Sequence, residues 1–142
     1  MHHIVNVEAA IYKNGSWLLV KRGPGEAHES GVLSLVGGKV DDTESSENIL
    51  EETITREVFE EVGLKIKNLQ YIHSTHFTST RSVVDIIFVC EYESGDIAIT
   101  QPEEVAEAVW LSNDEVASHP DIKEWTKKYI SLAREKLHSP HI

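Results

Sequence analysis

Residues 56–64 read Arg-Glu-Val-Phe-Glu-Glu-Val-Gly-Leu and carry the most specific pattern in the chain. We expect a helix that ends at Gly63, because glycine readily adopts the left-handed conformation that follows a last helical turn. Glu57, Glu60 and Glu61 stand at positions i, i+3 and i+4. A rotation of about 100° per residue therefore places these carboxylates on one face of the helix.

An apolar stripe borders this acidic face. It recurs every four residues and consists of Leu50, Ile54, Val58 and Val62. Glu57 and Glu61 lie beside the stripe, whereas a solvated acidic face would lie opposite the core. Like charges at this spacing weaken a helix, and a divalent metal ion with its preference for oxygen ligands would compensate. The spacing alone leaves two alternatives open, a metal site or an acidic surface helix.

The same residues resemble the second half of the Nudix box, the signature of the Nudix hydrolases (MutT-like proteins). That pattern reads G-x5-E-x7-R-E-U-x-E-E-x-G-U, where U is a bulky aliphatic residue. Every specified position from Arg56 to Leu64 agrees with it. Upstream, Gly37-Gly38-Lys39-Val40 resembles the opening of the box. The resemblance implies an α+β fold in which a mixed sheet is sandwiched between helices.

The spacing inside the box departs from the family pattern. Glu44 is correctly spaced from Gly38, but eleven residues separate Glu44 from Arg56 where the family has seven. Counting back from Arg56 places Asn48 at the early acidic position instead. Either residue could fill that position. We expect the extra residues to form a longer loop or an irregular first turn.

The resemblance implies a site for Mg²⁺ or Mn²⁺. In the family, a backbone carbonyl at the first box glycine, here Gly38, joins the metal ligands. The acids that would complete the set are Glu57, Glu60, Glu61 and Glu104. Among these, Glu57, Glu61 and Glu104 are all candidate general bases, and the sequence does not choose between them.

The assignment of Glu104 rests on its distance from a tryptophan. In MutT-like proteins an acid six residues before the tryptophan of a late strand reaches the metal. Glu104 has this spacing from Trp110, and Glu107, three residues before Trp110, is the alternative.

Other positions receive supporting roles. The resemblance makes Arg22, at the end of a predicted strand, and Lys39 candidates for binding substrate phosphate. Arg56 fits a structural ion pair that holds the glutamates in place better than a catalytic role. Gly37 and Gly63 are expected to be structural, one near the ligand and one at the helix end.

Length and charge limit the function further. The chain has 142 residues, enough for one domain with a real core, and we expect frayed ends at about 1–3 and 138–142. Its formal net charge of −11 argues against a nucleic-acid polymer as partner. No apolar run approaches the roughly 20 residues needed to cross a membrane. We therefore expect a cytoplasmic protein. The resemblance implies that its ligand is a small nucleotide, and it adds a homodimer as an expectation because dimers are common in the family.

Patterning predicts a strand-rich chain with a central and a C-terminal helix. Asn14-Gly15 between two apolar runs predicts a hairpin. The helix at the C-terminus is predicted over 121–137, and Ser112 is the predicted cap of a short helical turn. The other predicted strands cover 32–36, 65–73, 83–92, 97–100 and 108–111, with 74–82 as a connection.

The implied reaction is metal-assisted hydrolysis of a phosphoanhydride in a nucleoside diphosphate linked to another group. A (deoxy)nucleoside triphosphate pyrophosphohydrolase, which releases monophosphate and pyrophosphate, is the leading interpretation. The alternatives are hydrolysis of a nucleotide sugar or dinucleoside polyphosphate, or a non-catalytic module that binds nucleotide.

Overall fold

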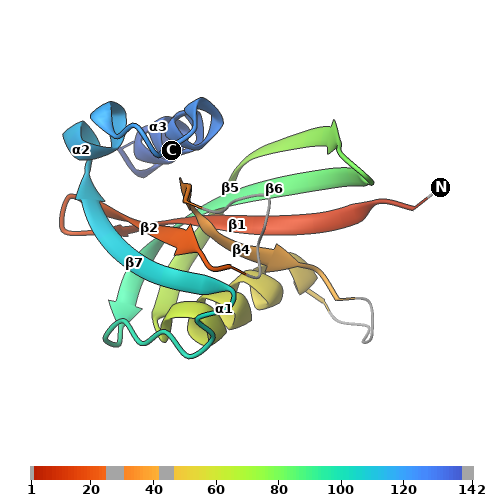
Figure 1. Cartoon of the computed structure of the whole chain (residues 1–142), viewed down its shortest axis with the longest axis horizontal. Coiled ribbons are helices and arrows are strands. Elements are labelled where there is room, and N and C mark those ends of the chain that lie inside the picture. The colour runs from red at the N-terminus through yellow and green to blue at the C-terminus, as the bar shows by residue number, and fades with distance from the viewer. Residues whose placement is uncertain (1, 25–30, 42–46, 139–142) are drawn as a thin grey trace.

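The computed structural model describes residues 2–24, 31–41 and 47–138, and in these a mixed sheet lies between helices (Figure 1). Helix α1 (Ile49–Val62) covers one face, and α2 (Asn113–Ser118) and α3 (Glu124–His138) cover the other. One buried cluster joins Val58 of α1 to the sheet, and a second joins Ile130 of α3 to the opposite face. The expected α+β sandwich is therefore confirmed.

The sheet is built around two long parallel strands. Strand β1 (Ile4–Lys13) pairs in parallel with β6 (Ser82–Ser94), and the other pairings between the described strands are antiparallel. The strand order is β3-β2-β1-β6-β5, with β4 paired to β1 and β7 paired to β2. The remaining strands are β2 (Ser16–Arg22), β3 (Leu33–Ser34), β4 (Val36–Lys39), β5 (Lys65–Thr78) and β7 (Val105–Ser112).

The first hairpin forms where the Asn-Gly pair predicts it. Asn14 has φ 48° and Gly15 has φ 83°, so both turn residues take the positive φ that a tight hairpin of this type requires. Lys13 pairs with Ser16 directly beside the turn, and Tyr12 pairs with Trp17 next to them.

The strand predicted over 32–36 is wrong in its bounds. Leu33 and Ser34 pair with β2, whereas the residues from Val36 onward pair with β1. Leu35 therefore separates two short strands. Gly37 and Gly38 then lie inside β4, opposite Glu8 and Val7, and not beyond the end of a strand. The glycines stay in the sheet because their backbone groups pair with β1.

Two predictions about the later strands are also wrong. The Ser/Thr-rich connection expected over 74–82 instead extends β5 as far as Thr78, because the backbone pairs with β6 whatever the side chains are. No strand forms over 97–100. There the amide of Ala98 donates to the carbonyl of Val62, and the hydroxyl of Thr100 donates to that of Glu60, so this segment packs on the end of α1.

The C-terminal part follows the predicted order of elements. Ser112 caps α2 in a reciprocal arrangement with Glu115. Helix α3 includes His138, which we had expected to be frayed, and the rest of the predicted frayed C-terminus, 139–142, lies outside the described residues. Among the described helices, none is both long and apolar enough to cross a membrane.

Candidate active site

Helix α1 brings two carboxylates to the edge of the sheet at β4. Ile54, Val58 and Val62 are buried against the sheet, which turns Glu57 and Glu61 toward β4. A Cβ atom on Gly38 would lie 2.5 Å from the carboxyl carbon of Glu57. Only glycine at this position therefore lets the Glu57 carboxyl approach the β4 backbone so closely.

The second carboxylate, Glu61, is paired with an arginine from another element. Nη1 of Arg22, the last residue of β2, donates to Oε1 of Glu61 at 2.9 Å. Nη2 of Arg22 donates to the backbone carbonyl of Leu35 at 3.3 Å. These two bonds fix the guanidinium between α1 and the segment that joins β3 to β4.

Both carboxylates are shifted toward the protonated form. The pKa of Glu61 is raised to about 8, because burial and the charge of Glu57 raise it by more than Arg22 lowers it. Burial and then the charge of Glu60 raise the pKa of Glu57, while Arg56 lowers it. Negative charge at this corner is therefore only partly compensated by the protein's own cations.

The corner has the chemical character of a divalent-cation site. Oε2 of Glu61 is buried and has no hydrogen-bond partner in the described part of the chain. This carboxylate oxygen is therefore free to bind a divalent cation, which prefers oxygen ligands. Glu57 and the β4 backbone at Gly38 lie beside one another. Within residues 2–24, 31–41 and 47–138, however, no three acidic, histidine or cysteine side chains converge closely enough to hold an ion.

A cleft of about 830 Å³ opens from this corner. The acids that line it are Glu8, Glu57, Glu61, Asp85 and Glu104, the last from the loop before β7, and the basic residues are Arg22 and Lys39. Seven predicted site residues are thus brought to one cleft: Arg22, Gly37, Gly38, Lys39, Glu57, Glu61 and Glu104.

Other predicted residues lie elsewhere. Glu60 does not line the cleft: its side chain is 48% exposed and lies 3.8 Å from Arg56, which is also 3.6 Å from Glu57. Glu107 pairs with Lys21 at 3.8 Å on the surface, so the structure favours Glu104 over Glu107 as the acid of the cleft.

The early acidic position of the box remains a prediction. Glu44 lies outside the described residues. Asn48 immediately precedes α1 with φ 57° and ψ 38°, makes no side-chain capping bond, and does not line the cleft. Because α1 begins at Ile49, the extra residues of the box fall before the helix and not within it.

Sequence reasoning missed the far end of the cleft. Its lining there includes Asn6, Thr75, Phe77 and Asp85 from β1, β5 and β6, together with Trp125 of α3. A single acid inside an otherwise apolar run, Asp85 within 83–89, is the one signal in the sequence. The partner strands could not be identified from it, because β1 and β6 lie far apart in the sequence.

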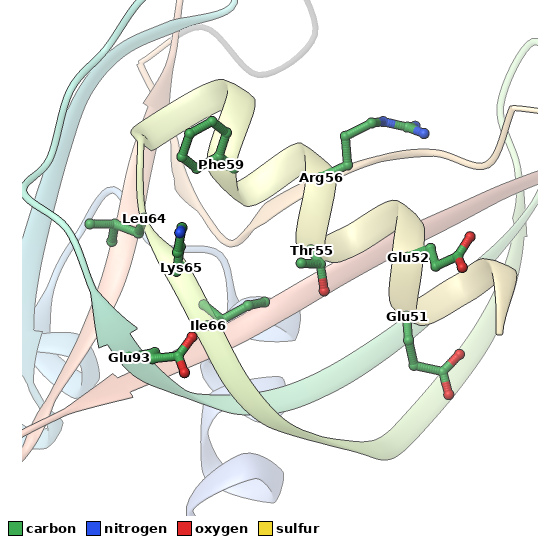
Figure 2. A pocket seen from close by; sticks show the side chains of 9 residues that line it. All are labelled: Glu51, Glu52, Thr55, Arg56, Phe59, Leu64, Lys65, Ile66 and Glu93. Atoms are coloured by element: carbon green, nitrogen blue, oxygen red, sulfur yellow. The ribbon is translucent and has the colours of Figure 1, made fainter.

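A second hollow, of about 550 Å³, lies on the other side of α1 (Figure 2). It is bounded by Phe59 and Arg56 of α1 and by Ile66 of β5. Figure 2 shows the carboxylates of Glu51 and Glu52 at the opposite end of the helix from Leu64. Neither Glu57 nor Glu61 lines this hollow, so it is separate from the candidate active site.

Known proteins share this architecture. The NUDIX domain family matches residues 2–133. A MutT NUDIX hydrolase from Burkholderia pseudomallei superimposes with a TM-score of 0.77 at 24% identity, over 93% of this chain and 98% of that one. The NUDIX domain of Shewanella oneidensis NrtR, solved with ADP ribose, superimposes with a TM-score of 0.79 at 21% identity, over 96% and 90%.

The chain therefore belongs to the Nudix family. By sequence it is also similar to the NAD-capped RNA hydrolase NudC of Shigella flexneri, with 37% identity over 111 residues. That alignment covers 78% of this chain but 40% of NudC, so the chain spans well under half the length of the curated relative it matches.

Proposed function

We infer that this Nudix domain hydrolyses a phosphoanhydride bond in a nucleoside diphosphate linked to another group, with Mg²⁺ or Mn²⁺ as cofactor. The observation that carries this proposal is the cleft corner where Glu57, Glu61 and the β4 backbone at Gly38 meet, with the unpartnered Oε2 of Glu61 among them. This combination of buried, partly neutralised carboxylates matches what a divalent ion needs.

The ion would be held by Glu57, Glu61 and the Gly38 carbonyl, and a rotated Glu60 or Glu104 would complete its ligands. Such an ion neutralises charge on phosphate oxygens and lowers the pKa of water. A carboxylate of the cleft then accepts the proton from the attacking water, and Glu57, Glu61 and Glu104 remain the candidates. Glu60 is included on its place in the box motif, because its side chain faces Arg56 here.

Positive groups of the cleft would bind the phosphates. Lys39 lines the cleft with an exposed side chain. Arg22 uses two of its five donors on Glu61 and Leu35, which leaves others to meet a phosphate oxygen. Arg56 holds Glu57 and Glu60 by ion pairs on the outer side of α1, which fits a structural role.

A nucleoside triphosphate is the substrate that we favour, with monophosphate and pyrophosphate as products. The far end of the cleft offers polar and aromatic groups for a nucleoside, and the acidic corner offers a place for the phosphates. The net charge of −11 favours a small ligand that arrives with its own metal over a polymer.

A dinucleotide linked by pyrophosphate, such as NAD, is the second candidate. The sequence similarity to a NAD-capped RNA hydrolase favours it. In a triphosphate and in a dinucleotide the bond that breaks is a phosphoanhydride. The acidic corner would therefore hold the metal ion for either substrate.

The test is a substrate panel with metal and chelator arms. Nucleoside triphosphates, NAD, ADP-ribose, a nucleotide sugar and a dinucleoside polyphosphate would each be incubated with Mg²⁺, Mn²⁺ or EDTA, and the products separated by chromatography. We expect metal-dependent release of pyrophosphate from triphosphates, lost in Glu61→Gln and kept in Glu107→Gln. Binding of nucleotide without any turnover across the panel would instead identify a non-catalytic module.

A further inference from the structure

A row of polar side chains crosses the sheet on the face that α3 covers. Lys39, Asn6, Asp85 and Thr75 lie on the adjacent strands β4, β1, β6 and β5, and each is paired directly with the next. Directly paired residues project from the same face of a sheet. All four line the cleft, so the row forms part of its floor.

The centre of the row is rich in hydrogen-bond acceptors. Asp85 is only 5% exposed, and Nδ2 of Asn6 donates to its Oδ1 at 2.9 Å. A carboxylate offers about four acceptor positions, and the amide oxygen of Asn6 adds more. Burying a charge among apolar strands is costly unless donors satisfy it, so this floor is suited to a ligand that brings adjacent N–H groups.

Aromatic side chains stand beside this floor. Phe77 and Trp125 are 47% and 54% exposed, although large apolar side chains are usually buried, and both line the cleft. Such surfaces bind flat rings by stacking. Tyr129 lines the cleft as well, and burial together with the charges of Asp85 and Glu8 raises the pKa of Tyr129 to about 12, so its hydroxyl keeps its proton.

From this arrangement we propose that Asp85 and Asn6 bind the guanine base of the nucleotide. Guanine carries two adjacent donors, the N1–H and the 2-amino group, which match a carboxylate beside an amide oxygen. Adenine and cytosine carry a ring-nitrogen acceptor next to their amino group. In the same position, the lone pair of that nitrogen would face a lone pair of the carboxylate and be repelled by it. The inference rests on the proposed function, because it identifies the base of that substrate.

The base contact can be tested without hydrolysis. Calorimetry with Mg²⁺ present would compare guanosine, inosine and adenosine monophosphates, since inosine lacks only the 2-amino group of guanosine. A site built around a hydrogen bond discriminates strongly against an analogue that lacks the donor, so we expect at least about tenfold weaker binding of the inosine compound. Adenosine monophosphate should bind weaker still.

Two matched variants locate the contact. In Asp85→Asn we expect the guanosine and inosine monophosphates to bind within about twofold of each other, because the amide no longer accepts from both donors. Asp96→Asn removes an exposed acid outside the cleft and should keep the unmodified preference. Circular dichroism checks that both variants fold, and if Asp85→Asn does not, the comparison of ligands on the unmodified chain decides.

Each outcome separates this inference from the proposed function. Equal binding of the three monophosphates, or an unchanged preference in folded Asp85→Asn, would overturn the role of Asp85. If triphosphates were then still hydrolysed with metal, the proposed function would stand alone. A clear guanine preference without any hydrolysis would support the base contact and overturn the catalytic proposal.

Discussion

Arg22 and Glu61 form a largely buried ion pair that joins β2 to the last turn of α1. Nη1 and Oε1 are 2.9 Å apart, and the two side chains are 15% and 3% exposed. The pair holds one oxygen of Glu61, while the other is buried and has no hydrogen-bond partner among the described residues. It thereby fixes the carboxyl that we propose as a metal ligand.

Removal of the arginine should destabilise the fold. In Arg22→Ala the Glu61 carboxyl loses its counter-charge, and breaking a buried pair costs about 3–5 kcal/mol. Arg22 lowers the pKa of Glu61, so its removal raises that pKa further, and protonation of Glu61 will reduce this loss as the pH falls. Urea unfolding without metal at pH 9 measures the free energy of unfolding directly.

Lys21→Ala is the matched control, because it breaks the exposed pair of Lys21 with Glu107. Exposed pairs contribute about 0–1 kcal/mol, so this variant should remain close to the unmodified chain. In the double variant Arg22→Ala/Glu61→Gln, most of the loss should be recovered, since no unpaired charge remains buried. An equal loss of unfolding free energy in Arg22→Ala and Lys21→Ala would show that the buried pair contributes no more stability than the exposed one.

The two box glycines should respond differently to a methyl group. In Gly37→Ala the new Cβ would collide with the backbone carbonyl of Val7, which cannot move away without disrupting the sheet. Overpacking of this kind typically costs about 1–3 kcal/mol or more. In Gly38→Ala the obstacle is the end of the Glu57 side chain, which can rotate.

Gly38→Ala should therefore fold and yet lose metal binding, because the Glu57 carboxyl is displaced. Thermal unfolding with and without Mn²⁺ measures both properties at once. We expect the melting temperature of Gly37→Ala to fall in both conditions, and that of Gly38→Ala to lose mainly its rise with Mn²⁺. A normal Mn²⁺-induced rise in Gly38→Ala would argue against Glu57 as a ligand.

Glu104 and Glu107 provide a pair of acids that differ in position. Glu104 lines the cleft and Glu107 pairs with Lys21 outside it. We expect Glu104→Gln to lower kcat by about 10- to 1,000-fold, the range of a lost acid–base or ligand contact. Glu107→Gln should stay within about twofold, because an exposed pair contributes little. Initial rates at saturating metal measure kcat of the two variants. A larger loss in Glu107→Gln than in Glu104→Gln would identify Glu107 as the acid of the site.

The cap of α2 predicts a pH effect away from the cleft. Hydrogen bonds from the backbone and side chain of Ser112 lower the pKa of Glu115 in the folded chain. A lowered pKa adds stability above the unfolded value of 4.5, and this stability is lost as the pH falls through the folded pKa. Glu115→Gln removes the carboxylate that accepts from the Ser112 backbone, so it should destabilise the chain at pH 7 and have a smaller effect in acid. Thermal unfolding between pH 3 and 7 measures the change, and a cost that does not vary with pH would contradict the account.

Local patterns in the sequence were sufficient for the elements that local physics controls. The Asn14-Gly15 turn, the helix that ends at Gly63 with φ 76° and the Ser112 cap each depend on residues a few positions apart. The box motif added the acids of α1 and the fold class. These predictions needed no knowledge of which strands pair.

Relationships between distant strands were not accessible in the same way. The change of partner at Leu35, the extension of β5 to Thr78 and the pairing of Asn6 with Asp85 all follow from sheet topology. A strand shows its own period in the sequence but not its neighbour. The far end of the cleft, lined by Asn6, Thr75, Phe77 and Asp85, therefore emerged only from the structure.

The central claim is that the α1 carboxylates hold the metal on which hydrolysis depends. The most direct measurement is kcat of Glu61→Gln with the best substrate of the panel at saturating Mg²⁺, beside Glu60→Gln and the control Glu107→Gln. We predict a loss of at least about a hundredfold for Glu61→Gln and for Glu60→Gln, with an unchanged circular dichroism spectrum. Turnover of Glu61→Gln close to that of the unmodified chain would contradict the claim.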